Sequence, residues 1–161
     1  MAVNPIPDGF HSVTPHMTVK DGGAAIEFYK KAFGAEEVFR MPGPDGKGVM
    51  HAEIQIGNSR VMLNEEWPME GAPKAPGTLN GTCVTIHVYV EDADAAFKKA
   101  VDAGATGACP PMDAFWGDRF GKVVDPYGHH WSIAQHTKEL TPEEIGKGAQ
   151  EWFKEMGSCK Q

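Results

Sequence analysis

The stretch TPHMTVKDGGAAI, from Thr14 to Ile26, is nearly repeated as TIHVYVEDADAAF, from Thr85 to Phe97. Thr, His, Val, Asp and a pair of Ala recur in the same order, each 71 residues further along the chain. Unrelated segments of this length share roughly one identity at ordinary residue usage. We therefore infer an internal duplication, in which each copy carries one histidine, His16 or His87.

Each copy continues with the same order of elements. An aspartate that can cap a helix follows the first strand of each copy (residues 13–19 and 83–90), and a glycine ends each helix, at Gly34 and Gly104. Alternating apolar and polar residues predict three further strands in each copy, at 37–40, 49–56 and 59–64, and at 105–108, 120–124 and 129–136. The pattern predicts an α+β protein with tandem β-α-β-β-β repeats, whose curved eight-stranded sheet surrounds a cavity.

The same pattern divides the chain into four parts. Residues 1–64 form the first repeat, 65–82 a Pro/Gly-rich connector, 83–138 the second repeat, and 139–161 a C-terminal helix and tail. A capping box from Thr141 to Glu144 begins the helix. One side of this helix then carries the apolar residues Ile145, Ala149, Trp152, Phe153 and Met156. We expect this amphipathic face to pack on its own sheet or on a partner subunit.

Composition excludes several classes of partner. The 161 residues carry a formal charge of −7 without a cluster of Lys or Arg, which argues against nucleic acid. No apolar run approaches the ~20 residues of a membrane span, and the first ten residues lack the pattern of a secretion signal, so we expect a cytoplasmic protein without a membrane partner. Cys83, Cys109 and Cys159 are widely spaced and are expected to be reduced thiols.

Three motifs resemble one known family. The motifs are FYKKAFGA (28–35), HAEIQIG (51–57) and DPYGHHW (125–131). Together with the duplication, they resemble the vicinal oxygen chelate superfamily, which contains glyoxalases, bleomycin-resistance proteins and extradiol dioxygenases. The resemblance is greatest to the uncharacterised bacterial branch of this superfamily. The resemblance implies a homodimer and a cavity for a small molecule. In metal-dependent members, the first and last strands of each half supply ligands to a divalent ion that chelates two neighbouring substrate oxygens.

Carried over residue by residue, those ligand positions fall on Thr14 and Thr85 in the first strands and on Met62 (or Val61) and Ser132 in the last strands. None of these is a usual metal ligand, so the standard site is unmatched.

His16 and His87 follow Thr14 and Thr85 by two residues and so share their strand faces. They could bind a divalent metal (zinc, nickel, manganese or iron) from both halves, or form local hydrogen bonds in a polar pocket. The loop FWGDRFG (115–121) adds two further candidates: Trp116 as a cover for a ligand and Arg119 as a partner for an anionic group. The alternative for the loop is that Asp118 and Arg119 pair with each other.

Three functions remain open on this pattern. The first is binding of a small organic molecule without chemistry, which the unmatched ligand positions favour; the negative charge is compatible with a cationic ligand. The second is a divalent-metal-dependent lyase, isomerase or dioxygenase with a non-standard site around His16 and His87. The third is a metal-free enzyme that uses a histidine as a general base. No catalytic residue and no cofactor is specified by the sequence itself.

Overall fold

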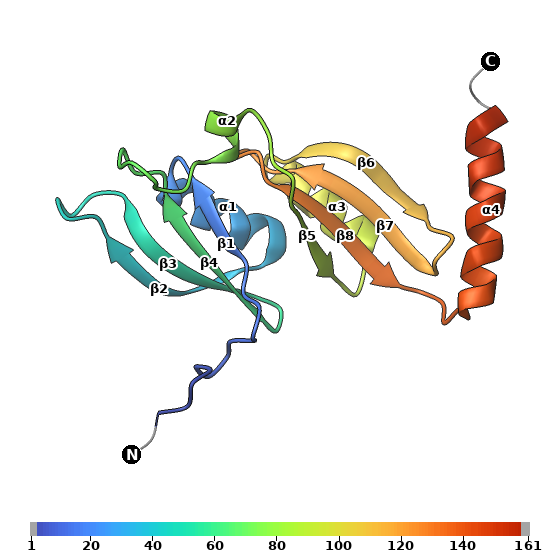
Figure 1. Cartoon of the computed structure of the whole chain (residues 1–161), viewed down its shortest axis with the longest axis horizontal. Helices are drawn as coiled ribbons and strands as arrows, with labels where there is room; N and C mark the ends of the chain where they lie inside the picture. The colour runs from blue at the N-terminus through green and yellow to red at the C-terminus, as the bar shows by residue number, and fades with distance from the viewer. Residues whose placement is uncertain (1–2, 159–161) are drawn as a thin grey trace.

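The computed structural model of the chain describes residues 3–158, without the side chains of residues 156–158, and Cys159 lies outside the described residues. Its α+β architecture confirms the fold class, with the β-α-β-β-β order appearing twice (Figure 1). The first half comprises β1 (His16–Val19), α1 (Gly22–Phe33), β2 (Glu36–Pro42), β3 (Val49–Ile56) and β4 (Ser59–Glu65). The second half comprises β5 (Thr85–Tyr89), α3 (Ala93–Asp102), β6 (Thr106–Asp113), β7 (Asp118–Val124) and β8 (His130–His136).

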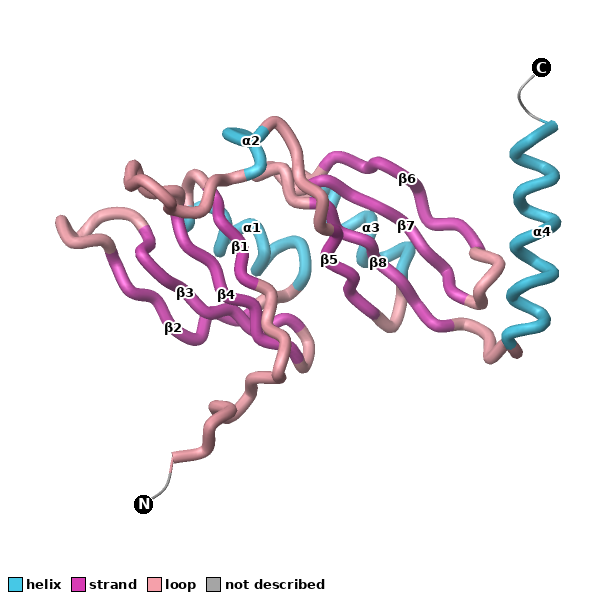
Figure 2. Tube along the Cα trace, in the orientation of Figure 1, coloured by secondary structure: helices cyan, strands magenta, loops and turns pink. Residues whose placement is uncertain are grey.

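The eight strands form two four-stranded sheets, ordered β1-β4-β3-β2 and β5-β8-β7-β6, and not one continuous sheet. Within each half the first strand runs parallel to the last, and the other neighbours are antiparallel. The sheets lie side by side, with β1 and β5 at the edges nearest to each other (Figure 2). In the described chain, β1 and β5 do not hydrogen-bond to each other.

The helix boundaries follow the predicted signals. Asp21 and Asp92 each accept a hydrogen bond from the third following backbone N–H, at 2.8 and 2.9 Å. Gly34 ends α1 with a left-handed φ of 67°, a backbone conformation that glycine adopts readily. Thr141 and Glu144 form the predicted capping box before α4 (Pro142–Ser158).

Two elements differ from the prediction. The connector contains one short helix, α2 (Pro76–Leu79), which begins at a proline suited to a first helical turn. Strand β6 runs through Pro110 and Pro111 instead of stopping before them. It can do so because it is an edge strand with register shifts around Cys109, where a missing N–H donor is tolerated.

A buried carboxylate joins the two halves. The Oδ2 atom of Asp125 accepts hydrogen bonds from the Tyr29 hydroxyl (2.7 Å) and from Trp131 Nε1 (3.0 Å), and its Oδ1 atom accepts from the backbone N–H groups of Tyr127 and His129, both at 2.9 Å. Burial raises the pKa of Tyr29, and the negative charge of Asp125 adds to that rise. His129 also reaches across to the first half, with Nε2 3.0 Å from the carbonyl oxygen of Thr18.

Helices α1 and α3 pack against each other beside this bond, and an aromatic cluster fills the space around it. The cluster comprises Phe28, Tyr29, Phe33, Tyr127 and Trp131.

Helix α4 lies beside the second sheet (Figure 1). It contacts the second half where Trp152 packs against Phe115, with ring centroids 5.9 Å apart. Within residues 3–158, no helix combines the length and the apolar character that a membrane crossing requires.

Candidate functional site

The face of the second sheet that is turned away from α3 carries a histidine–serine pair. Strand pairing sets His87 opposite Ser132, and the Ser132 hydroxyl oxygen lies 2.6 Å from His87 Nδ1. Ser132 is buried and His87 is exposed. The imidazole stacks near Phe120, with ring centroids 6.4 Å apart, and meets Tyr89 edge-on at 4.7 Å. The serine thus fixes the orientation of the ring, which leaves Nε2 free of this contact.

A second polar cluster on the same face is organised around Asp118, which is only 4 % exposed. Its carboxylate accepts hydrogen bonds from Trp116 Nε1 (2.9 Å) and from the Tyr89 hydroxyl (3.4 Å), and Nδ1 of His136 lies 2.8 Å from it. The bond to Asp118 raises the pKa of His136. Trp116 is held on the open face by this carboxylate, with its ring 5.3 Å from that of Phe120. The predicted alternative, an Asp118–Arg119 pair, is therefore wrong.

Arg119 points to different partners. Its Nε and Nη2 atoms bind both carboxylate oxygens of Asp94 on α3, at 2.5 and 2.8 Å, and Nη1 lies 3.1 Å from Asp113 on β6. The guanidinium therefore links β7 to the helix and to the edge strand. The structure does not bring Arg119 together with His87. A role for Arg119 in ligand binding therefore stays a prediction.

The corresponding face of the first sheet carries His16. Its ring meets that of His51 edge-on, with centroids 5.8 Å apart, and His51 Nε2 lies 3.6 Å from a carboxylate oxygen of Glu53. Burial lowers the pKa of His16, the nearby charge of His51 lowers it further, and a hydrogen bond with Asn64 opposes the shift. This face also carries Phe39, whose ring centroid lies 6.3 Å from that of His51.

The strand register resolves the one-residue ambiguity in the sequence comparison. His16 pairs with Met62 as His87 pairs with Ser132, so Met62 is the counterpart of Ser132. Val61 points into the core and is 4 % exposed. Thr85 begins β5 opposite His130, and Thr14 precedes β1, with its hydroxyl bonded to the carbonyl of His11 at 3.2 Å. The histidines, not the threonines, thus lie beside the last-strand positions.

The structure places His16 and His87 in separate surroundings. His16 lines a cavity of about 560 Å³ with Thr82, Cys83 and His129, whereas His87 lines the larger groove described next. Throughout residues 3–158, no group of three or more His, Cys, Asp or Glu side chains could hold a metal ion. The four family ligand positions, two Thr, one Met and one Ser, do not form a donor set that suits a divalent cation either. Metal binding by the two histidines remains a prediction.

A groove of about 840 Å³ runs between the halves, which we name the inter-half groove. One wall comes from α1 and from the β3–β4 turn, and the other from β5 and α3. Its apolar lining includes Phe33, Ile56, Ile86, Val88 and Ala96, with Trp131 also contributing, and its polar lining includes His87 and Arg60. Of the predicted site residues, His87 lines the groove, as does Val61, the alternative to Met62. Sequence reasoning missed the rest, because these residues come from six elements (α1, β3, β4, β5, α3 and β8) and share no local motif.

Comparison with known proteins agrees with this geometry. The sequence profile of the Glyoxalase/Bleomycin resistance protein/Dioxygenase superfamily matches residues 9–133. The chain is 47 % identical over 147 residues to "Uncharacterized protein Rv0887c" of Mycobacterium tuberculosis, which covers 90 % of this chain and 84 % of that protein.

Solved structures are similar as well. The crystal structure of TioX from Micromonospora sp. ML1 superposes with a TM-score of 0.63 at 27 % identity, covering 78 % of this chain and 98 % of TioX. The X-ray structure of the Arabidopsis thaliana gene product At5g48480 gives 0.62 at 31 % identity, with coverages of 78 % and 98 %. The chain therefore belongs to the glyoxalase/bleomycin resistance protein/dioxygenase superfamily.

Proposed function

We propose that this protein binds a small organic molecule reversibly, without chemical conversion, in the inter-half groove. The observation that carries the proposal is the groove itself: about 840 Å³ of space with mainly apolar walls and a few polar groups. Pockets for small molecules in proteins usually measure ~300–1,000 Å³ and combine apolar walls with a few placed polar groups. The lack of usual metal ligands at the four family positions supports binding without chemistry.

Residues from both halves of the groove lining would hold a ligand. Phe33 on α1 and Val88 on β5 offer apolar surface from opposite halves, and Trp131 contributes an aromatic ring between them. Because the Tyr29–Asp125 bond holds the halves together beside this site, the walls are preformed. A preformed apolar site binds at a lower entropic cost than one that must be assembled by the ligand.

We further propose that the protein is a homodimer. β1 and β5 are edge strands, and unpaired strand edges favour association with another chain. Helix α4 adds apolar surface for such a contact, since Phe153 is 65 % exposed. Light scattering at micromolar concentration should give twice the 17.4 kDa chain mass; a monomer at that concentration would refute this part of the proposal.

The alternative is a divalent-metal-dependent lyase, isomerase or dioxygenase around His16 and His87. It is favoured by one observation, the equivalent register of the two histidines beside Met62 and Ser132. Its test is the metal content of untagged protein purified without chelator or nickel resin, compared with His16→Ala and His87→Ala variants. About one metal ion per subunit, lost in both variants, would favour the enzyme. Protein that takes up no zinc, nickel, manganese or ferrous iron on titration would exclude this site.

The binding proposal is tested with a neutral fluorescent probe, N-phenyl-1-naphthylamine, whose emission rises in apolar surroundings. We expect saturable binding to the wild-type protein and strongly weakened binding to Ala96→Phe, because Ala96 lines the groove and the larger ring fills it. The matched control is Ala24→Phe, an exposed alanine on α1 outside the groove. Equal binding by all three proteins would place the probe elsewhere and refute the proposal.

A further inference from the structure

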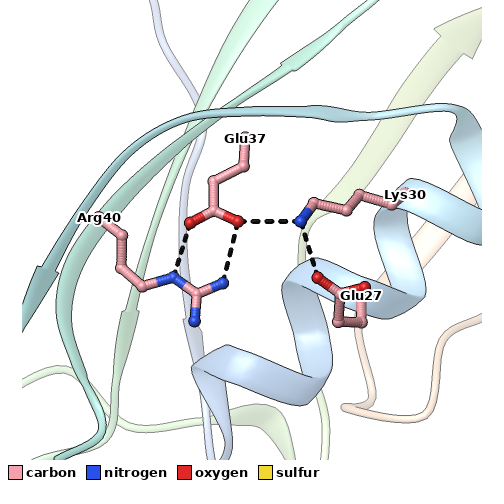
Figure 3. A network of polar contacts seen from close by, with 4 residues as sticks. All are labelled: Glu27, Lys30, Glu37 and Arg40. Carbon is pink, nitrogen blue, oxygen red and sulfur yellow. Dashed lines mark hydrogen bonds and ion pairs between the residues drawn. The ribbon is translucent and has the colours of Figure 1, made fainter.

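The chain has three arginines, and two of them are fully committed to carboxylates. Arg40 binds both oxygens of Glu37 through Nε and Nη2, at 2.7 and 3.0 Å, and Lys30 joins the same carboxylate at 2.9 Å (Figure 3). Arg119 binds both oxygens of Asp94 in the same forked manner. A planar guanidinium favours this two-point contact with a carboxylate.

The third arginine, Arg60, has no carboxylate partner among the described residues and lines the inter-half groove. Its Nε and Nη1 atoms are buried and have no hydrogen-bond partner among the described residues. The guanidinium lies instead near the ring of Phe10, with Cζ 5.8 Å from the ring centroid. A buried N–H donor of a charged group that makes no hydrogen bond destabilises the fold, so two such donors on one side chain require an explanation. A ring face supplies some electrostatic attraction to a cation but accepts none of its N–H bonds in the forked geometry.

The charge of the groove points in the same direction. Arg60, Lys99, His11 and His87 line it, whereas no Asp or Glu is among the described residues that do so. The two cations Arg60 and Lys99 in this lining contrast with the net charge of −7 for the whole chain, which counts histidine as neutral. The net charge of the chain is compatible with a cationic ligand, but the charged residues that line the groove are cationic and favour an anionic one. A bound molecule experiences the nearby groups more strongly than distant, screened ones.

The segment over Arg60 is not part of the sheet. Gly9 and Phe10 cover the guanidinium, and a Cβ atom on Gly9 would lie 3.2 Å from Arg60 Nε. The hydrogen bonds that the structure gives these residues are local, such as Phe10 N–H to the carbonyl of Pro7 at 3.1 Å. No strand pairing of the described chain includes them. Displacement of residues 9–10 would thus expose Nε and Nη1 without the loss of a strand pairing.

We propose that the inter-half groove is selective for apolar molecules that carry one carboxylate, and that Arg60 is the anchor for that carboxylate. The apolar body would lie against Phe33, Ile56 and Val88, and the carboxylate would accept the unpaired N–H donors of Arg60. This inference rests on the proposed binding function and adds to it the chemical class of the ligand. It assigns to Arg60 the two-point carboxylate contact that Arg40 and Arg119 already make within the chain.

The test compares three probes that share one apolar tail: octanoate, 1-octanol and octylamine. Each is titrated by calorimetry at pH 7.5 into the wild-type protein, Arg60→Gln and the control Arg40→Gln. Arg40 is a suitable control because its guanidinium is bound to Glu37 on β2 and does not line the groove. We expect the wild type to bind octanoate more tightly than octanol or octylamine. Arg60→Gln should lower octanoate affinity about tenfold or more, the usual effect of losing a hydrogen-bonded charge, and change octanol affinity less than about twofold.

Each outcome distinguishes this inference from the function on which it rests. Octanol binding by Arg60→Gln serves as the internal check that the variant keeps a folded groove. If octanoate and octanol bind equally well and Arg60→Gln changes neither, the anion selectivity is refuted while the groove remains a binding site. A preference for octylamine, or an equal loss of octanoate binding in Arg40→Gln, refutes the anchor role of Arg60. If none of the three probes binds, both the inference and the proposed function fail.

Discussion

Replacing Tyr29 by Phe removes one hydrogen bond between the two halves and leaves the ring in place. Tyr29 donates to Asp125 at 2.7 Å, and that carboxylate, 4 % exposed, keeps three other donors after the substitution. Hydrogen bonds to charged groups contribute about 1.5–3 kcal/mol, and the remaining donors still stabilise the charge, so we expect a loss of about 2 kcal/mol. For a chain of this length, that corresponds to about 4–8 °C in the melting temperature.

The assay is urea unfolding followed by tryptophan fluorescence, since Trp131 is buried beside the lost bond. Tyr127→Phe is the matched control: its ring belongs to the same cluster, and the described structure gives its hydroxyl no hydrogen bond. The control should change the free energy of unfolding by less than about 0.5 kcal/mol. If Tyr29→Phe costs no more than Tyr127→Phe, the buried bond does not join the halves in the way described.

Two further predictions concern packing and protonation. Gly22→Ala should lower the free energy of unfolding by about 1–3 kcal/mol, because the added Cβ would lie 2.6 Å from that of Val49. Gly23→Ala should be neutral or slightly stabilising, because its Cβ would have no neighbour nearer than 3.5 Å. Equal urea midpoints for the two variants would contradict this prediction. The hydrogen bond with Asp118 raises the pKa of His136 in the folded protein. The charged pair therefore stabilises the fold fully below pH about 6.5, the pKa of an unfolded histidine, and this stabilisation is lost as the pH rises through the pKa of His136 in the folded state. His136→Gln should therefore lower the urea midpoint more at pH 5.5 than at pH 9, and an unchanged difference would refute the linkage.

Much of the fold could be predicted from the sequence because its determinants are local. The helix caps at Asp21 and Asp92 and the turn glycines act within a few residues, and the repeat of His16 at His87 reports a duplicated unit. The exception within one unit is β6, where Pro110 and Pro111 suggested an end to the strand. An edge position removes that restriction, and strand order is not visible in local sequence.

The candidate site could be predicted only in part because it depends on contacts between distant residues. The side chain of Arg119 is committed to Asp94, 25 residues earlier, rather than to the adjacent Asp118. The separation of the two sheets, which creates the inter-half groove, follows from the packing of α1 on α3 and from the Tyr29–Asp125 bond across 96 residues. An unpaired Arg60 has no sequence signal at all, since a missing partner becomes visible only when every neighbour has been placed.

The most direct measurement of the central claim is a map of amide chemical-shift changes on addition of octanoate to the ¹⁵N-labelled protein. If the inter-half groove is the binding site, the changes should cluster on both of its walls, around Phe33 and Ser59 in the first half and around Val88 and Ala96 in the second. Changes clustered on the open sheet faces around His16, Trp116 or His136, or no saturable change anywhere, would contradict the account.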